Sequence, residues 1–237
     1  MKLSLFTILI FLIPQFGFSQ NTMCQSDTSH HKSKIYLAPL ALATASALSW
    51  STGLDDDIQN WRLKSLPDFH NTLDDPMQFM AYGLVHVLPV FGLKTKHNFK
   101  TRSFLAGKSA LLAMGTTYIL KYSINRTRPS GASHAFPSGH TGFAFVGAEL
   151  FYQEYKDRYP VLAYLGYAIG AQVAVFRVMN NQHWFSDVLA ASAVGILSTK
   201  LVYALHQHKF SNNSWKKKKF SFFPDPINKG LVLSFRF

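Results

Sequence analysis

The chain has 237 residues, of which 48% are hydrophobic and only 15% are charged. This composition excludes a disordered chain, and the charged fraction lies below the roughly 25% of ordinary soluble domains. It indicates either a membrane environment or deeply buried helices. The formal net charge of +12 favours anionic partners. Because no nucleic-acid-binding motif is present, we expect a phosphorylated lipid or small phosphate ester as partner and no nucleic acid.

The first nineteen residues are typical of an export signal. Lys2 supplies a positive charge, residues 3–14 are mostly apolar, and small residues follow. We predict cleavage after Ser19, although an uncleaved membrane anchor has the same pattern. Cys24 is the only cysteine and therefore forms no internal disulfide. We expect no lipidation there.

Six apolar segments follow a polar stretch, residues 20–34, that we expect to be loose. The segments are longer than typical strands and rich in Ala, Leu and Met, so we predict an all-α bundle. They cover Ile35–Trp50, Met77–Leu93, Ser103–Tyr122, Thr141–Tyr152, Val161–Phe176 and Val188–Leu205.

Two of these segments are the most typical of a membrane span. Val161–Phe176 and Val188–Leu205 contain no acidic residue. Both are somewhat shorter than the roughly 20 apolar residues that span a bilayer. Because a buried helix of a soluble bundle has a similar composition, both interpretations stay open.

The C-terminal tail differs in composition from the helices. Lys216–Lys219 is either a solvated charge run or a contact with an anionic membrane surface. Phe220–Pro224 is aromatic, and Gly230–Phe237 alternates apolar and polar residues as a strand does. The predicted parts are a signal peptide, a loose segment, a helical domain and a basic, aromatic tail, over residues 1–19, 20–34, 35–208 and 209–237.

Three short clusters carry the candidate chemistry, and the first joins Lys121 to Arg128. Lys121 ends an apolar segment, and Arg128 precedes Pro129, which favours a helix stop. Two such cations can hold one anion from different sides, and the planar guanidinium matches phosphate oxygens. A solvated basic helix end has the same appearance when this cluster is considered alone.

The second cluster, Ser138-Gly139-His140, directly precedes an apolar run. A turn that opens a helix leaves backbone N–H groups free, and the helix dipole favours an anion there. Gly139 permits the backbone to approach a ligand closely. Alternatively, Ser138 is a simple N-cap and His140 an ordinary residue of the first turn.

The third cluster contains Arg177, His183 and Asp187. His183 and Asp187 are four residues apart, and therefore share one face if this segment is helical. A carboxylate that binds one imidazole nitrogen leaves the other as a nucleophile. Arg177 adds a third cation, although a His–Asp pair at a helix start can also be purely structural.

Together the clusters supply what phosphoryl transfer through histidine requires. Cations and N–H groups hold the phosphate oxygens, one histidine attacks phosphorus, and the other protonates the leaving oxygen. Since lysine and arginine provide the positive charge, we expect no metal and no cofactor. We interpret the aspartate runs Asp55–Asp57 and Asp74–Asp75 as turns and helix caps.

The three motifs K-x(6)-R-P, P-S-G-H and R-x(5)-H-x(3)-D resemble the type 2 phosphatidic acid phosphatase and vanadium haloperoxidase superfamily. The resemblance covers Lys121 to Asp187. It implies a six-helix bundle of that type over residues 35–208. It also implies a metal-independent phosphatase that hydrolyses a phosphate or diphosphate monoester through a phosphohistidine.

The resemblance also implies a role for each motif residue. His183 is the expected nucleophile, Asp187 its partner, and His140 the general acid and then the base. The expected phosphate-binding residues are Lys121, Arg128, Ser138, Gly139 and Arg177. One departure is visible, because Phe176 stands where the family usually has a serine, which removes one expected hydrogen bond to phosphate.

Four functions remain open at this point. The first is a lipid phosphatase of the membrane with its active site facing the periplasm, which export, low charge and apolar helices favour. The second is a soluble periplasmic acid phosphatase of broad specificity. The third is a vanadium haloperoxidase, in which His183 would bind vanadate. The fourth is a binding protein that kept the pocket.

Overall fold

The computed structural model describes residues 36–214, 220–224 and 231–235, with side-chain surroundings given up to residue 207. The predicted signal peptide, the segment of residues 20–34 and the four lysines at 216–219 lie outside these described residues.

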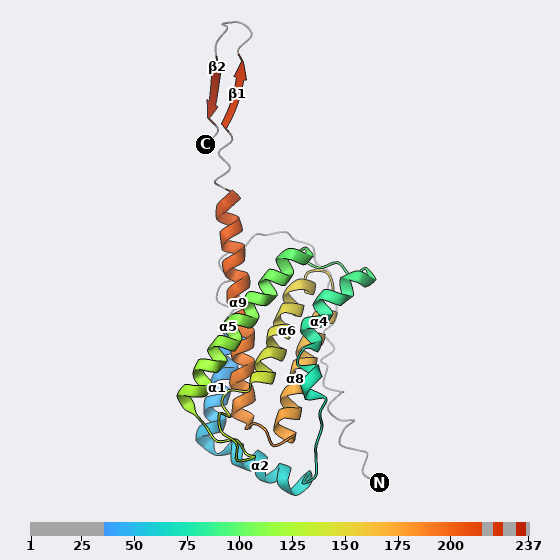
Figure 1. Cartoon of the computed structure of the whole chain (residues 1–237), viewed down its shortest axis with the longest axis vertical. Helices are drawn as coiled ribbons and strands as arrows, with labels where there is room; N and C mark the ends of the chain where they lie inside the picture. The colour runs from blue at the N-terminus through green and yellow to red at the C-terminus, as the bar shows by residue number, and fades with distance from the viewer. Residues whose placement is uncertain (1–35, 215–219, 225–230, 236–237) are drawn as a thin grey trace, which may run out of the picture. The chain divides into compact units, whose positions relative to one another are not determined.

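Helices form the body of the structure, as the all-α prediction requires. α6 lies at the centre and contacts α4, α5, α8 and α9, while α1 packs along α9 (Figure 1). The main helices are α1 (Leu37–Thr52), α4 (Met80–Val87), α5 (Phe99–Ile124), α6 (Gly139–Tyr155), α8 (Leu165–Met179) and α9 (Phe185–Ser214). They correspond to the six apolar segments, so the fold class is confirmed.

Two of the predicted segments are interrupted. The segment at Met77–Leu93 forms α4 and then the 3-10 helix η2 (Leu88–Phe91), where Pro89 lacks a backbone N–H for the α-helical pattern. The segment at Val161–Phe176 contains a break at Tyr164, between the short helix α7 (Pro160–Ala163) and α8.

Two further helices and two strands complete the described elements. α2 (Leu54–Ser65) was not predicted, because its charged and amide residues hide the apolar periodicity of a packed helix. α3 (Asp74–Met77) is a single turn. In the tail, β1 (Phe220–Pro224) and β2 (Leu231–Phe235) pair antiparallel, with Phe222 opposite Leu233.

Glycines allow the central helices to approach closely. A Cβ atom added to Gly195 of α9 would lie 2.5 Å from the carbonyl oxygen of Gly142 on α6. A Cβ atom added to Gly147 would lie 2.6 Å from the backbone nitrogen of Tyr82 on α4. No side chain fits at either crossing without displacing a backbone, so these glycines set the spacing of the bundle.

The direction of the helices gathers the three motifs at one end of the bundle. α5 and α8 end there, whereas α6 and α9 begin there, close to α2 (Figure 1). The side chain of Ser138 caps α6 by accepting from the backbone N–H of Thr141 at 3.5 Å. This end of the bundle therefore holds the N-terminus of α6 and the chemistry of every cluster.

Candidate active site

All eight predicted site residues lie at this end of the bundle. Lys121 is in the last turn of α5 and Arg128 in the connector that follows. Ser138, Gly139 and His140 open α6. Arg177 is in the last turn of α8, while His183 and Asp187 flank the start of α9. Ser138 donates its backbone N–H to the carbonyl oxygen of Asp187 at 3.3 Å, which joins the second cluster to the third.

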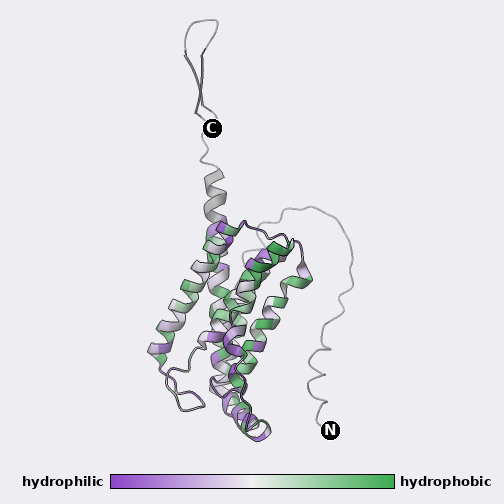
Figure 2. Ribbon diagram, turned by 45° about the vertical axis from the view of Figure 1, so that its right-hand side comes forward, coloured by the Kyte–Doolittle hydropathy of each residue, from purple (hydrophilic) through white to green (hydrophobic). Residues whose placement is uncertain are grey.

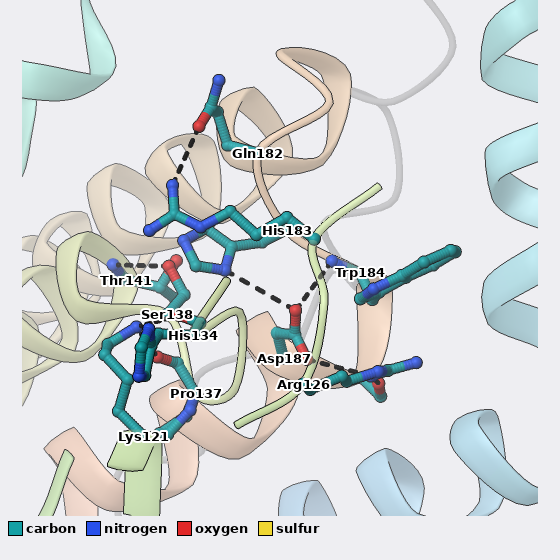
Figure 3. Close-up of polar contacts among 12 residues, drawn as sticks. Lys121, Arg126, His134, Pro137, Ser138, Thr141, Gln182, His183, Trp184 and Asp187 are labelled. Atoms are coloured by element: carbon teal, nitrogen blue, oxygen red, sulfur yellow. Dashed lines mark hydrogen bonds and ion pairs between the residues drawn. The ribbon is translucent and has the colours of Figure 1, made fainter. Parts of the chain in front are cut away.

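The ammonium group of Lys121 fixes the loop before α6. It donates to the carbonyl oxygens of His134 at 2.7 Å and Pro137 at 3.0 Å (Figure 3). Pro137 directly precedes Ser138, so Lys121 shapes the approach to the N-terminus of α6. An ammonium has three donors, which leaves one for a bound anion.

In the described part of the chain, three guanidinium groups have a buried Nε with no hydrogen-bond partner. Those of Arg128 and Arg177 lie at this end of the bundle, whereas that of Arg102 lies near the start of α5. Arg128 donates from Nη1 to Gln182 at 3.0 Å, and Arg177 donates from Nη1 to Asp74 at 2.8 Å. Each side chain is thus anchored at one nitrogen while others stay available. A buried N–H without a partner is costly, and an oxyanion would satisfy it.

The charged groups of the site lie close enough to change one another's pKa. Burial lowers the pKa of Arg128, and the guanidinium of Arg177 lowers it further. Burial also lowers the pKa of His183 to about 4. Arg177 and Arg128 add to that decrease in the pKa, while Asp187 opposes it. The site therefore combines these cations with an imidazole that is neutral at neutral pH.

His183 is 2% exposed, and its Nδ1 lies 3.6 Å from Oδ2 of Asp187 (Figure 3). This distance is longer than a hydrogen bond. Nδ1 nevertheless points towards the carboxylate, so Nε2 is the nitrogen left for other chemistry. The structure thus brings His183 and Asp187 together, although His183 precedes α9 and does not share a helical face with Asp187, as the spacing had suggested.

The Asp187 carboxylate is held from two sides. Its Oδ2 accepts from the backbone N–H of Trp184 at 2.9 Å, and its Oδ1 accepts from Nη1 of Arg126 at 2.9 Å (Figure 3). The Arg126 guanidinium also donates to Asp55 at 2.7 Å and lies over the rings of Trp50 and Trp184. Arg126 therefore anchors the acidic partner of His183 to α1 and α2.

His140 in the first turn of α6 contacts a carboxylate that its motif does not include. Its Nε2 lies 3.0 Å from Oδ1 of Asp75. Burial lowers the pKa of His140 and Arg177 lowers it further, while Asp75 and Asp74 raise it. The imidazole thus stands between opposing charges.

The interpretation of the aspartate runs as turns and helix caps was incomplete. Asp55 and Asp74 do lie in the first turns of α2 and α3. However, both are buried, and their carboxylates bind side chains far along the sequence: Asp55 accepts from Arg126 and Asp74 from Arg177. No local sequence signal identifies such partners.

Phe176, at the position where the family usually has serine, packs its ring against that of Phe69 at 6.4 Å between centroids.

Within residues 36–207, no group of three or more His, Cys, Asp or Glu side chains is arranged to hold a metal ion.

Comparisons with known proteins agree with the motifs. Residues 103–211 match the family model of the PAP2 superfamily, which confirms the resemblance. Lipid A 1-phosphatase of Porphyromonas gingivalis is 35% identical over 166 residues, which cover 69% of this chain. The same alignment covers 37% of that relative, so the chain spans little more than a third of its length.

Two solved structures are also similar to this chain. One is a transmembrane PAP2-type phosphatidylglycerolphosphate phosphatase from Bacillus subtilis, with 20% identity, a TM-score of 0.44, and coverage of 74% of this chain and 96% of the other. The second is LpxE of Aquifex aeolicus, with 18% identity, a TM-score of 0.46, and coverage of 65% and 94%.

Proposed function

Because residues 103–211 match the family model of the PAP2 superfamily, we propose that the protein is a phosphatase that transfers the phosphoryl group of a phosphate monoester to His183 and then to water. One observation carries the proposal. Arg128 and Arg177 each present a buried, unpartnered Nε beside the neutral imidazole of His183, within the residues that the structure describes. A phosphoryl group satisfies both donors at once.

The phosphate binds against the N-terminus of α6 in this proposal. Arg128 and Arg177 hold its oxygens from two sides, and the backbone N–H groups that follow Ser138 hold it from a third. Gly139 has space for this approach, because the nearest atom to an added Cβ is a methionine carbon at 3.9 Å. The third N–H of Lys121 completes the set.

In the first step, Nε2 of His183 attacks phosphorus while the bond from phosphorus to the ester oxygen breaks. His140 gives its proton to that leaving oxygen, so the alcohol departs neutral. The attacking imidazole must be unprotonated, and the low pKa of His183, about 4, keeps it so at neutral pH. Asp187 stabilises the positive charge that develops on the imidazole.

In the second step, water attacks the phosphorus of the phosphohistidine. His140, now unprotonated, takes a proton from this water, and the bond between phosphorus and Nε2 breaks. Inorganic phosphate leaves, and His183 and His140 return to their starting states. The cations stabilise the transition state of both steps, because each transition state carries negative charge on the same phosphoryl oxygens.

We propose a phosphorylated lipid as the substrate and a membrane as the location. Two stretches are long and apolar enough to cross a bilayer: Pro160–Met179, with mean hydropathy 1.5, and Phe185–Gln207, with mean hydropathy 1.8. Large apolar side chains on other helices are also exposed, such as Leu111 and Ile119 of α5 at 77% and 70%. Such exposure favours contact with lipid.

The distribution of polar residues supports an active site at the membrane surface. Hydrophobic residues run along the long helices, whereas hydrophilic residues are frequent at the end that holds α2 (Figure 2). His140 and His183 lie outside both candidate spans. A lipid headgroup would therefore meet the catalytic groups at the interface. We further propose that this end faces the periplasm, in line with the predicted export signal.

The lipid A phosphatase activity named for the relative makes lipid A phosphate the first substrate to test. We would purify the protein in mild detergent and measure phosphate release from lipid A, phosphatidic acid and a soluble aryl phosphate, with EDTA present. We expect hydrolysis by the wild type and none by His183→Ala. A requirement for a divalent metal, or activity without His183, would contradict the mechanism. Halide oxidation with added vanadate, without phosphate release, would contradict the function.

A further inference from the structure

Asp75 reaches His140 from a part of the chain that carries none of the three motifs. Its Oδ1 lies 3.0 Å from Nε2 of His140 and 3.9 Å from Nη1 of Arg177. The Asp75 side chain is 65% exposed, whereas that of His140 is 32% exposed. The contact therefore lies at the mouth of the site, beside the group proposed to protonate the leaving oxygen.

The backbone that carries Asp75 is fixed by its neighbours. Asp74 accepts from Nη1 of Arg177 at 2.8 Å and from Nδ2 of Asn180 at 3.2 Å. Asn180 also bonds to the backbone N–H and carbonyl oxygen of Asn71, at 2.9 and 2.6 Å. These bonds tie the turn that contains α3 to the end of α8. An exposed carboxylate on such an anchored turn loses less freedom when it holds a partner than one on a free loop.

The charges around His140 oppose one another. In the described residues, the charged groups that act on it are Arg177 on α8 and the carboxylates of Asp74 and Asp75 on α3. Arg177 disfavours the imidazolium, as burial does, and the two carboxylates favour it. Asp74 is already paired with Arg177, which leaves Asp75 as the carboxylate in direct contact with the imidazole.

We propose that Asp75 is a positioning residue, which orients the imidazole of His140 and stabilises its protonated form before the leaving oxygen departs. With Nε2 donating to Asp75, Nδ1 is the nitrogen that delivers the proton. Asp75 does not touch the phosphoryl group. This inference rests on the proposed phosphatase function and adds a second His–carboxylate pair to that of His183 and Asp187.

The test compares Asp75→Asn with wild type, using the pH dependence of kcat/KM for an alkyl phosphate monoester. Asparagine keeps the size of the side chain but loses its charge, so the pKa of His140 falls. Since a general acid works only when protonated, the alkaline limb of kcat/KM moves to lower pH, by about one unit for the loss of one adjacent charge. At pH values above the alkaline limbs of both proteins, kcat/KM of Asp75→Asn is about tenfold lower than that of the wild type.

Two controls isolate the role of His140. Asp68→Asn makes the same chemical change at an exposed position of the connector before α3, and we expect its profile to match the wild type. The ionisation of the substrate is common to all variants, so only a difference between profiles reports the enzyme. Asp75→Glu, which restores the charge, is expected to recover most of the shift.

The leaving group provides a second readout. Nitrophenolate departs without protonation, so the kcat/KM for p-nitrophenyl phosphate should be much less sensitive to Asp75→Asn than that for an alkyl phosphate. A purely structural role would lower both values equally.

Three results would overturn the inference: an equal loss of kcat/KM at every pH, a lower KM with an unshifted profile, or equal losses for both leaving groups. The wild type and His183→Ala are measured in the same series. If the wild type released no phosphate, or His183→Ala were fully active, the proposed function itself would fail. A normal wild type with an unshifted Asp75→Asn profile would reject only the role of Asp75.

Discussion

Arg126 donates from Nη1 to Oδ1 of Asp187 at 2.9 Å, and from Nη2 to Asp55 at 2.7 Å. The Arg126 side chain is 14% exposed and lies over two tryptophan rings. One guanidinium therefore joins the carboxylate that faces His183 to α2. Because Asp187 faces His183, the position of the imidazole depends on Arg126, which is not among the eight predicted site residues.

We expect Arg126→Ala to lower kcat about 10- to 100-fold, with a smaller change in KM, since a lost charged hydrogen bond costs about 1.5–3 kcal/mol. The substrate cations remain in place, so binding is largely kept. Steady-state kinetics on the purified variant would measure both constants. Circular dichroism must show an intact fold for the comparison to hold. A folded variant with wild-type kcat would contradict a role for Arg126 in positioning Asp187.

Replacing either guanidinium by an ammonium tests how the phosphate is held. Arg128→Lys and Arg177→Lys keep the charge but lose the planar fork, and we expect kcat/KM to fall about 10²- to 10³-fold, as for the loss of one transition-state donor. Arg158→Lys is the matched control, because Arg158 is exposed at the other end of α6. Equal activity in all three variants would mean that neither arginine contacts the reacting phosphate.

The acid limb of the pH profile reports the nucleophile. Burial lowers the pKa of His183 from 6.5 to about 4, so the imidazole stays neutral at all pH values well above 4. The fraction of active nucleophile therefore falls only as the pH drops through about 4. We expect the acid limb of kcat/KM there, measured with phosphate-release assays in constant ionic strength buffers. An acid limb of kcat/KM near pH 6.5 that is assigned to the titration of His183 would contradict a buried, neutral imidazole.

We expect opposite effects on stability from replacing a glycine at the close crossing of α6 and α9 and a glycine that has open space around it. Gly195→Ala would place a Cβ 2.5 Å from the Gly142 carbonyl oxygen, and we expect a loss of about 1–3 kcal/mol in the free energy of unfolding. Gly107→Ala on α5 meets no atom within 4 Å and should stabilise the helix by about 0.5–1 kcal/mol. Melting temperatures in detergent measure both. A Gly195→Ala protein as stable as wild type would contradict the close packing.

Local patterns in the sequence predicted the main helices and the eight motif residues. Apolar runs of this length specify helices, and the short separation of His183 and Asp187 in the chain keeps them near each other, although His183 precedes α9. The clusters meet because α5, α6, α8 and α9 alternate in direction along the bundle. These features depend on residues close together in the chain, and therefore appear in the sequence.

The supporting residues could not be predicted in the same way. Asp55 is 131 residues from Ser186, to which it binds, and Asp74 is 103 residues from Arg177. Only tertiary packing pairs them, and an aspartate at the start of a helix looks like a cap in either case. Arg126 lies inside the first motif, but nothing local distinguishes it from Arg128, which is proposed to bind phosphate.

The most direct test of the central claim is to trap the phosphorylated enzyme. Wild-type protein is mixed with a phosphate monoester, quenched in alkali after a fraction of a turnover, digested, and analysed by mass spectrometry. We predict one phosphoryl group on the peptide that contains His183, stable in alkali and labile in acid, and absent from His183→Ala. Phosphate on another residue, or rapid hydrolysis by the wild type with no phosphorylated enzyme at any quench time, would contradict a phosphohistidine mechanism.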